Sequence, residues 1–219
     1  MNKVLITGAT GFVGQWLVRL KPVNLTIYGI GRAKYEAMEW TNERWTYIIH
    51  LAPTPPTDIL KCGERILYAS SGIVYHPENE VRKKYRDSKI EGEAECVASG
   101  ANVVIARLFT FYGKGLDDNK AVSTFQKAGR EGRPLVISGD GTTTRSYMHG
   151  REMARWMWAI LKHGERGEAY DVGSDFPITM LELANVYAAG APIVIQGGKD
   201  PMPYYMPKDT AKTKALLDK

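Results

Sequence analysis

Short apolar runs alternate with amphipathic segments along the first half of the chain. Apolar runs bounded by glycine or polar residues are typical of buried strands, and they lie at 4–6, 25–30, 47–51, 65–69 and 103–108. Apolar residues recur at helical spacing over 11–20, and a segment rich in Glu and Lys predicts a second helix over 81–98. Strands that alternate with helices in this way predict a parallel sheet that is covered on both faces.

The second half of the chain has a more mixed pattern. Apolar residues at helical spacing predict a helix over 151–163. Thr179 and Glu182 have the spacing of a capping box, so another helix is expected to start there. We also expect a strand over 191–195 and, after an extended stretch with three prolines, a short Lys-rich helix from Asp209.

The composition is that of an ordinary globular protein. Its 219 residues allow one domain, or one domain with a small lobe, and 44% hydrophobic with 24% charged residues excludes disorder, collagen and coiled coil. Cys62 and Cys96 follow no metal or disulfide spacing, so we expect inert thiols in a reducing compartment and no metal site. No apolar run reaches about 18 residues. No apolar signal region precedes the first strand, so we expect a cytoplasmic protein without a membrane span.

The net charge is +5, from 29 basic and 24 acidic residues, and it fits either a nucleic acid or an anionic small molecule as partner. No run of five like charges occurs, which argues against nucleic acid. The densest basic stretch is Arg-Lys-Lys at 82–84, and a solvated helix start is its simplest interpretation.

Three glycines follow the first predicted strand, in the sequence Thr-Gly-Ala-Thr-Gly-Phe-Val-Gly at 7–14. Gly8 permits a tight turn, Gly11 lets the backbone approach a pyrophosphate, and Gly14 lets the next helix sit against the sheet. A pyrophosphate would accept hydrogen bonds at the helix N-terminus, where the helix dipole favours negative charge. Because a strand precedes the glycines and a helix follows them, the motif predicts dinucleotide binding.

The end of the second predicted strand bears on which dinucleotide binds. An Asp or Glu there would hold the ribose 2′-hydroxyl of NAD, but the sequence is Tyr-Gly-Ile-Gly-Arg at 28–32, without a carboxylate. An arginine suits a 2′-phosphate, so Arg32 favours NADP over NAD. The alternative is that Arg32 is a solvated surface residue.

Tyr85 and Lys89 are four residues apart on a predicted helix and therefore share a face, with Cβ atoms about 5–6 Å apart. A tyrosine that acts as a base near pH 7 needs its pKa lowered by about three units, and an adjacent ammonium has the right sign. Such a pair is common by chance, but Ser71 supplies a hydroxyl partner just after the predicted strand 65–69. Ser71, Tyr85 and Lys89 are therefore the catalytic candidates.

Together these motifs resemble a known family. The glycine-rich turn, the Ser-Ser-Gly-Ile-Val-Tyr segment at 70–75 and the Tyr-x-x-x-Lys at 85–89 are similar to the extended short-chain dehydrogenase/reductases, in the nucleotide-sugar epimerase/dehydratase branch. The resemblance covers nearly the whole chain and continues through 50–52, 106–113, 139–148, 170–174 and 207–212.

The predicted fold is an α/β Rossmann-type, doubly wound parallel sheet with a small C-terminal substrate-binding lobe. We assign residues 1–112 and 151–164 to the dinucleotide-binding part, and 113–150 and 165–219 to the lobe. A nucleotide cofactor and its substrate would meet in the cleft at the carboxyl ends of the strands.

The resemblance implies a role for each site residue. Ser71 would hydrogen-bond the reacting sugar hydroxyl or carbonyl, Tyr85 would transfer the proton, and Lys89 would hold the nicotinamide ribose. Arg145 would pair with the substrate diphosphate, and Thr110 stands where the family usually has an asparagine that touches the substrate. The residues expected to hold the cofactor are Gly8, Thr10, Gly11, Phe12, Val13, Gly14, Arg32, Leu51, Ala52, Tyr85 and Lys89.

The two residues that follow Ser71 limit which reactions of the family are expected. The family's 4,6-dehydratases and decarboxylases have an acidic residue within two positions of the catalytic hydroxyl, whereas this chain has Gly72 and Ile73. Epimerisation of a nucleoside-diphosphate sugar, or reduction of a keto sugar, needs only hydride and proton transfer. Arg32 favours a reductase and the 70–75 segment favours an epimerase, so both stay open. A cofactor-binding, non-catalytic member with a regulatory or structural role is the alternative.

Relatives of this type are longer, and the sequence indicates which segments of this chain have fewer residues. Only 16 residues (31–46) lie where the fold needs a helix, a strand and a second helix, and 13 residues with three prolines (52–64) follow the third strand. We therefore predict a reduced or missing edge strand and a stunted helix after the third strand. Because that helix usually contributes to the family's dimer interface, a homodimer is the weaker expectation.

Overall fold

A six-stranded parallel sheet forms the larger part of the molecule. The computed structural model describes residues 2–36, 42–52, 57–118, 120–200 and 202–219, without the side chains of 32, 33, 57 and 58. The strands pair in parallel in the order β2-β1-β3-β4-β5-β9. They are β1 (Asn2–Thr7), β2 (Leu25–Ile30), β3 (Trp45–His50), β4 (Gly63–Ser71), β5 (Val103–Leu108) and β9 (Ala169–Val172). The predicted Rossmann-type sheet is confirmed.

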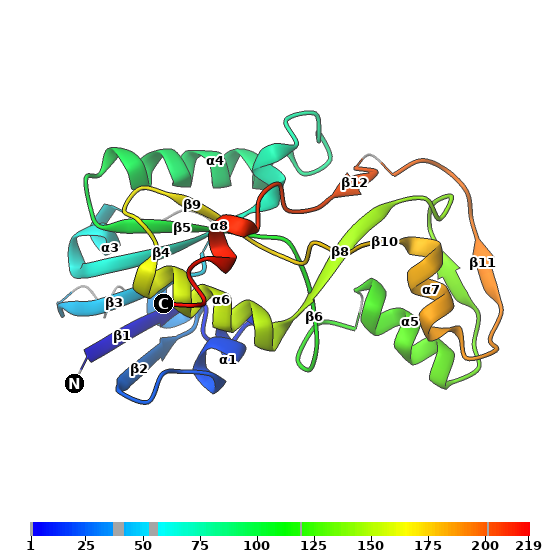
Figure 1. The fold of residues 1–219 in the computed structure, drawn as a ribbon, viewed down its shortest axis with the longest axis horizontal. Helices are drawn as coiled ribbons and strands as arrows, with labels where there is room; N and C mark the ends of the chain where they lie inside the picture. Colours follow the sequence, from blue (N-terminus) through cyan, green and yellow to red (C-terminus); the bar gives the residue numbers. More distant parts are fainter. Residues whose placement is uncertain (1, 37–41, 53–56, 119, 201) are drawn as a thin grey trace.

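Helices cover both faces of this sheet, which explains why its strands are apolar on both sides (Figure 1). One face carries α1 (Phe12–Arg19), α6 (Gly150–His163) and α8 (Ala211–Lys214), and the other carries α3 (Thr57–Cys62) and α4 (Lys83–Ala98). Successive strand residues enter opposite cores. Val4 and Ile6 join the core that contains Leu17 of α1, whereas Leu5 joins the core that contains Cys96 of α4.

The elements predicted in the first half of the chain are all present, with ends that differ from the predictions by two residues or fewer. In the second half, the helix predicted over 151–163 is α6, and it packs against α1 and the sheet. None of the helices in the described part of the chain combines the length and the apolar character that a membrane crossing requires.

The boundary predicted for the lobe differs from the structure at residues 165–219. β9 lies within this range, yet it pairs with β5 and completes the large sheet, and α8 packs on β9 and α6. Tyr170 and Val172 of β9 are buried in the same core as α6. A four-residue strand carries too little periodicity to be recognised in a sequence, so only the pairing with β5 identifies it.

The region predicted to be shorter than in relatives lies near β2, at the edge of the sheet opposite β9. Among the described residues β2 is the edge strand, and it is followed by the five-residue helix α2 (Arg32–Glu36). α3 after β3 has six residues and is short, as predicted. Residues 37–41 and 53–56, on which both predictions also bear, lie outside the described part.

The lobe lies at the far end of the molecule from the N-terminus (Figure 1). Two helices, α5 (Ala121–Arg130) and α7 (Met180–Ala188), pack on the pair β7 (Leu135–Ile137) and β11 (Ile193–Ile195) around an apolar core of their own. The strands that join the lobe to the sheet are β6 (Thr110–Tyr112), β8 (Thr144–His149), β10 (Pro177–Thr179) and β12 (Tyr204–Tyr205). α7 starts at the predicted capping box, with both of its hydrogen bonds present. α5, β6, β7, β8, β10 and β12 were not predicted.

Candidate active site

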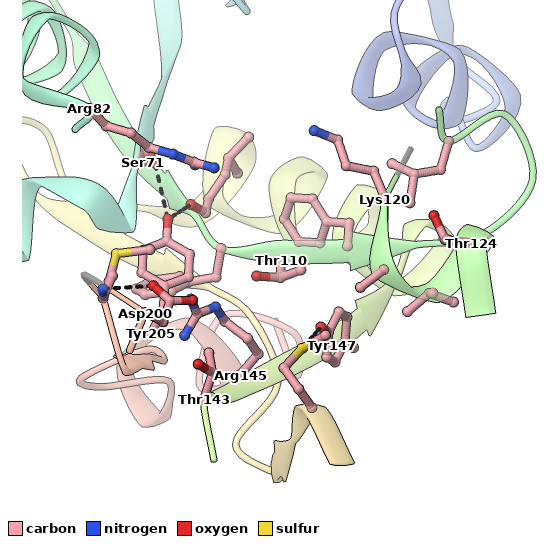
Figure 2. Close-up of a pocket in the computed structure, with 18 of the residues that line it drawn as sticks. Ser71, Arg82, Thr110, Lys120, Thr124, Thr143, Arg145, Tyr147, Asp200 and Tyr205 are labelled. Atoms are coloured by element: carbon pink, nitrogen blue, oxygen red, sulfur yellow. Dashed lines mark hydrogen bonds and ion pairs between the residues drawn. The ribbon is translucent and has the colours of Figure 1, made fainter. Parts of the chain in front are cut away.

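A cleft of about 980 Å³ lies between the carboxyl ends of the large sheet's strands and the lobe (Figure 2). The predicted site residues that line it are Phe12, Val13, Leu51, Ser71, Tyr85, Lys89, Thr110 and Arg145. The described residues that line it do not include Gly8, Thr10, Gly11, Gly14 or Ala52. The side chain of Arg32 lies outside the described part of the chain, so the NADP prediction stays a prediction.

The glycine-rich turn has the backbone geometry that its sequence requires. Gly8 has φ +69°, in the left-handed region. A Cβ on Gly14 would lie 2.5 Å from Gly8 O and from Ala9 Cα, so Gly14 packs against the turn itself rather than against the sheet. Gly11 is the N-cap of α1, no side chain caps this helix, and its first turn has no acidic residue. An uncapped, positively polarised helix start is suited to the pyrophosphate of a dinucleotide.

The adjoining strand end is tied to this turn. Thr7 at the end of β1 has its Oγ1 3.1 Å from Nδ1 of the buried His50 at the end of β3. The amide of Leu51 donates a 3.1 Å hydrogen bond to the same Thr7 Oγ1. These contacts fix the backbone at Leu51 where its side chain lines the cleft.

Lys89 is buried on α4 and joins strand β4 to the segment that follows β3. Its Nζ donates hydrogen bonds to Ala69 O at 2.6 Å and to Ala52 O at 3.2 Å. Burial lowers the pKa of Lys89 to about 8. The Nζ atom lies 5.8 Å from the ring centroid of Tyr85, which is 42% exposed, so the two side chains share a face of α4 as predicted.

Ser71 ends β4 and caps a short 3₁₀ helix, η1 (Gly72–Tyr75). Its Oγ accepts a 3.3 Å hydrogen bond from Ile73 N and lies 3.2 Å from the hydroxyl of Tyr205. A Cβ on Gly72 would lie 2.3 Å from the ring of Phe109, so this position admits no side chain. Ile73 is buried.

Arg145 on β8 faces the same cleft from the lobe (Figure 2). Its Nη1 donates to Thr144 O at 2.9 Å, and its Nη2 donates to Asp200 Oδ2 at 3.0 Å. Burial lowers the pKa of Arg145, and the charge of Asp200 opposes this shift. The predicted anion-binding arginine therefore already has an anionic partner.

The cleft as a whole carries positive charge. Its basic lining residues are Arg82, Lys89, Lys120, Arg145 and Lys199. Among the described residues that line it, Asp200 is the only carboxylate. Of the basic run at 82–84, Arg82 lines the cleft, whereas Lys83 forms a 3.3 Å surface ion pair with Asp87. Such a cleft attracts anionic small molecules.

Tyr205 and Asp200 were missed from the sequence. Both lie in the proline-containing stretch before the C-terminal helix, which has no periodicity to indicate which side chains turn inward. Side chains alternate between the two faces of β12, so Tyr204 is 56% exposed whereas Tyr205 is only 8% exposed. Only the pairing of β12 with β8 reveals this, because it brings Tyr205 next to Ser71.

A polar network supports α4 next to the cleft. Glu93, one turn after Lys89 on α4, accepts hydrogen bonds from Arg107 Nε at 2.9 Å and Nη2 at 2.6 Å, and from Ser70 Oγ at 2.5 Å. Arg107 Nη1 donates to Tyr75 OH at 2.7 Å, which in turn donates to Asp171 of β9 at 3.0 Å. This chain of bonds links α4, β4, β5 and β9 beside the cleft.

The family model named NAD dependent epimerase/dehydratase family matches residues 57–173. The chain belongs to this family. The match includes β4, α4 and β5, and therefore Ser71, Tyr85 and Lys89. The resemblance that the motifs carry is confirmed at the level of the family.

A curated relative is UDP-glucuronic acid decarboxylase 4 of Arabidopsis thaliana, 30% identical over 182 residues, which cover 72% of this chain and 41% of that protein. The chain thus spans about two fifths of the length of that relative.

Two solved structures share the fold. One is dTDP-glucose 4,6-dehydratase from Bacillus anthracis in complex with NAD, with TM-score 0.83, 17% identity and coverage of 100% of this chain and 91% of that one. The other is UDP-glucuronic acid 4-epimerase from Bacillus cereus with UDP-glucuronic acid and NAD, with TM-score 0.78, 21% identity and coverage of 99% and 93%.

Proposed function

We propose that this protein is an NAD(P)-dependent enzyme that acts on a nucleoside-diphosphate sugar, as an epimerase or a keto-sugar reductase. The proposal rests on the set of side chains that line one cleft. Ser71, Tyr85 and Lys89 lie on its sheet side, and Arg145 with other basic side chains faces them. A hydroxyl group to be oxidised and a diphosphate to be held are the two features of a nucleotide sugar that this arrangement matches.

The cofactor fits the glycine-rich turn, because the uncapped start of α1 offers backbone amides to a pyrophosphate. A bound nicotinamide supplies the hydride acceptor or donor. The chain's own residues do the rest: Ser71 orients the reacting sugar oxygen, and Tyr85 takes or gives its proton. Lys89, on the same face of α4 as Tyr85, would hold the nicotinamide ribose.

Dehydration and decarboxylation are less well supported, although proteins that catalyse them are among the relatives. Gly72 admits no side chain beside Phe109, and Ile73 is buried and apolar. The carboxylate of Asp200 is paired with Arg145. Apart from Asp200, the described lining residues include no carboxyl group that could take part in elimination.

Arg32 at the start of α2 makes NADP the preferred cofactor in this proposal, and NAD the alternative. Replacing Arg32 by Ala removes the partner of a 2′-phosphate. We expect the affinity for NADP⁺ to fall about tenfold relative to that for NAD⁺. Unchanged affinity for both cofactors, measured by calorimetry, would assign Arg32 to the surface and favour NAD.

The central experiment combines cofactor identification with turnover. Mass spectrometry of the purified protein identifies the nucleotide that copurifies, and turnover is then measured on UDP-glucose, UDP-glucuronic acid and dTDP-glucose. Tyr85→Phe is expected to lower activity by about 10²–10⁴-fold, whereas Tyr204→Phe, an exposed tyrosine outside the cleft lining, serves as the matched control. Undiminished activity in Tyr85→Phe would remove Tyr85 from its assigned role.

A non-catalytic, cofactor-binding role is the second candidate. It draws support from the ion pair that Arg145 already forms with Asp200. Bound cofactor without turnover on any of these three sugars or on a keto sugar such as UDP-4-keto-6-deoxy-D-glucose would favour it over the enzyme.

A further inference from the structure

The hydroxyl of Ser71 belongs to a chain of three hydrogen bonds, of which Figure 2 draws the contact between Ser71 and Tyr205. Ile73 N lies 3.3 Å from Ser71 Oγ, Ser71 Oγ lies 3.2 Å from Tyr205 OH, and Tyr205 OH lies 3.3 Å from Leu108 O. The first group is an amide, which can only donate. The last is a carbonyl oxygen, which can only accept.

These two ends fix the direction of the chain. A tyrosine hydroxyl has one proton, and Tyr205 donates it to Leu108 O. The oxygen of Tyr205 must then accept in its contact with Ser71, so Ser71 donates its own single proton to Tyr205. Ser71 Oγ already accepts from Ile73 N and keeps one lone pair. Toward a ligand in the cleft, Ser71 is therefore an acceptor and not a donor.

Tyr205 is held firmly enough to impose this direction. It is 8% exposed, and its ring lies 5.1 Å from that of Phe109 and 5.6 Å from that of His76. Its strand β12 pairs with β8, which also carries Arg145. Burial raises the pKa of Tyr205 to about 12, so its hydroxyl stays protonated throughout the neutral range.

We propose that Tyr205 is a positioning residue that holds Ser71 as a hydrogen-bond acceptor, so that the resting site is matched to a sugar hydroxyl rather than to a sugar ketone. A hydroxyl donates to the free lone pair of Ser71. A ketone can only accept, so it gains a hydrogen bond from Ser71 only when the Ser71 proton leaves Tyr205. The inference rests on the proposed function, because it concerns how a sugar binds at Ser71.

The test compares two ligands, UDP-glucose, which has a hydroxyl at C4, and UDP-4-keto-6-deoxy-D-glucose, which has a ketone at C4 and also lacks the hydroxyl at C6. The protein carries its oxidised cofactor and the Tyr85→Phe substitution, which prevents turnover. Calorimetry gives the ratio of the two dissociation constants. Comparing this ratio between variants cancels the other differences between the ligands.

Tyr205→Phe keeps the ring but frees the Ser71 proton. We expect the ratio to shift toward the ketone by about three- to tenfold, the size of one net hydrogen bond. The matched control is Tyr204→Phe, the same change at the neighbouring exposed position, which should leave the ratio unchanged. An unchanged ratio in Tyr205→Phe, with both ligands bound, overturns the inference and leaves the proposed function standing. Binding of neither ligand to any variant overturns both.

A second variant tests the same point without changing Tyr205. Ser71→Ala removes the acceptor, so it should weaken binding of UDP-glucose more than that of the keto ligand. In the Ser71→Ala background, Tyr205→Phe should no longer change the ratio. Equal losses for both ligands in Ser71→Ala would mean that Ser71 is not held as an acceptor. A merely structural Tyr205 would lower both affinities together and leave the ratio where it was.

Discussion

The two sides of the cleft are built in different ways. On the turn side, one continuous stretch, residues 7–14, supplies a strand end, a glycine turn and a helix start. On the side where the lobe approaches the sheet, Tyr205 contacts Ser71 although 134 positions separate them in the chain, and Arg145 contacts Asp200 across 55 positions. Local backbone conformation forms the first side, and long-range strand pairing forms the second. A motif can therefore reveal the first but not the second.

Arg107 and Arg145 differ in how far their hydrogen-bond donors are already used by other side chains. Arg107 forms two hydrogen bonds with Glu93 and a third with Tyr75, and the Glu93 interaction raises its pKa. Arg145 makes a single contact with Asp200, and burial lowers its pKa. Arg107 uses three of its five N–H groups in bonds to two side chains, whereas Arg145 uses two, one of them to the backbone oxygen of Thr144, and has more donors left for a ligand.

The largest expected effect tests the turn side. Gly14→Ala places a Cβ 2.5 Å from backbone atoms of the turn, so we expect the free energy of unfolding to fall by about 3 kcal/mol or more. Gly11→Ala is the matched control for stability, because its Cβ would meet only Gly8 O at 3.5 Å. Denaturant titration should show little change for Gly11→Ala, while calorimetry should show weaker dinucleotide binding. Equal stability of both variants would contradict the close packing of Gly14.

The next effect separates the two arginines. Arg107→Met leaves Glu93 largely buried without its partner, and we expect a loss of about 2–4 kcal/mol of unfolding free energy. Arg145→Met leaves the more exposed Asp200 unpaired, at a cost of about 1 kcal/mol or less. Affinity for UDP should respond in the opposite order, with the loss in Arg145→Met. Similar stability losses in both variants would remove the distinction.

A pH effect follows from Lys89, whose pKa is lowered to about 8 by burial. In the unfolded chain the pKa of lysine is about 10.4, so between these values the unfolded state binds more protons. Stability due to Lys89 therefore rises with pH across this window and is lowest below about pH 8. Relative to Lys89→Met, the protein should gain about 2 kcal/mol between pH 7 and pH 9.5. A constant difference between the two in urea titrations would show that Lys89 keeps an ordinary pKa.

The smallest expected effect tests the partner of Arg145. Asp200→Asn removes the carboxylate that competes with a diphosphate, and UDP should bind about fivefold more tightly, or about 1 kcal/mol. Asp117→Asn makes the same charge change at an exposed position outside the cleft lining and should leave UDP affinity unchanged. Weaker binding in Asp200→Asn would instead make Asp200 a support for Arg145.

Much of the large sheet could be read from the sequence because its strands are buried on both faces and therefore appear as continuous apolar runs. Val4 to Ile6 and Val103 to Ala106 are examples, and each is almost fully buried. β9 escaped because four residues carry no periodicity. The lobe's α5, β7 and β8 escaped because their pattern was mixed and their partners were distant in the chain.

By itself, the sequence determined the family and the local geometry of the site: a glycine turn, a hydroxyl at a strand end, and Tyr85 with Lys89 on one face of a helix. Each of these depends on residues within a few positions of one another, so backbone conformation alone places them. Only the tertiary structure decided which groups face them. The pairing of β12 with β8 sets Tyr205 against Ser71, and the approach of Asp200 gives Arg145 a partner. Contacts between residues so far apart are fixed by packing of the whole chain, which no local pattern encodes.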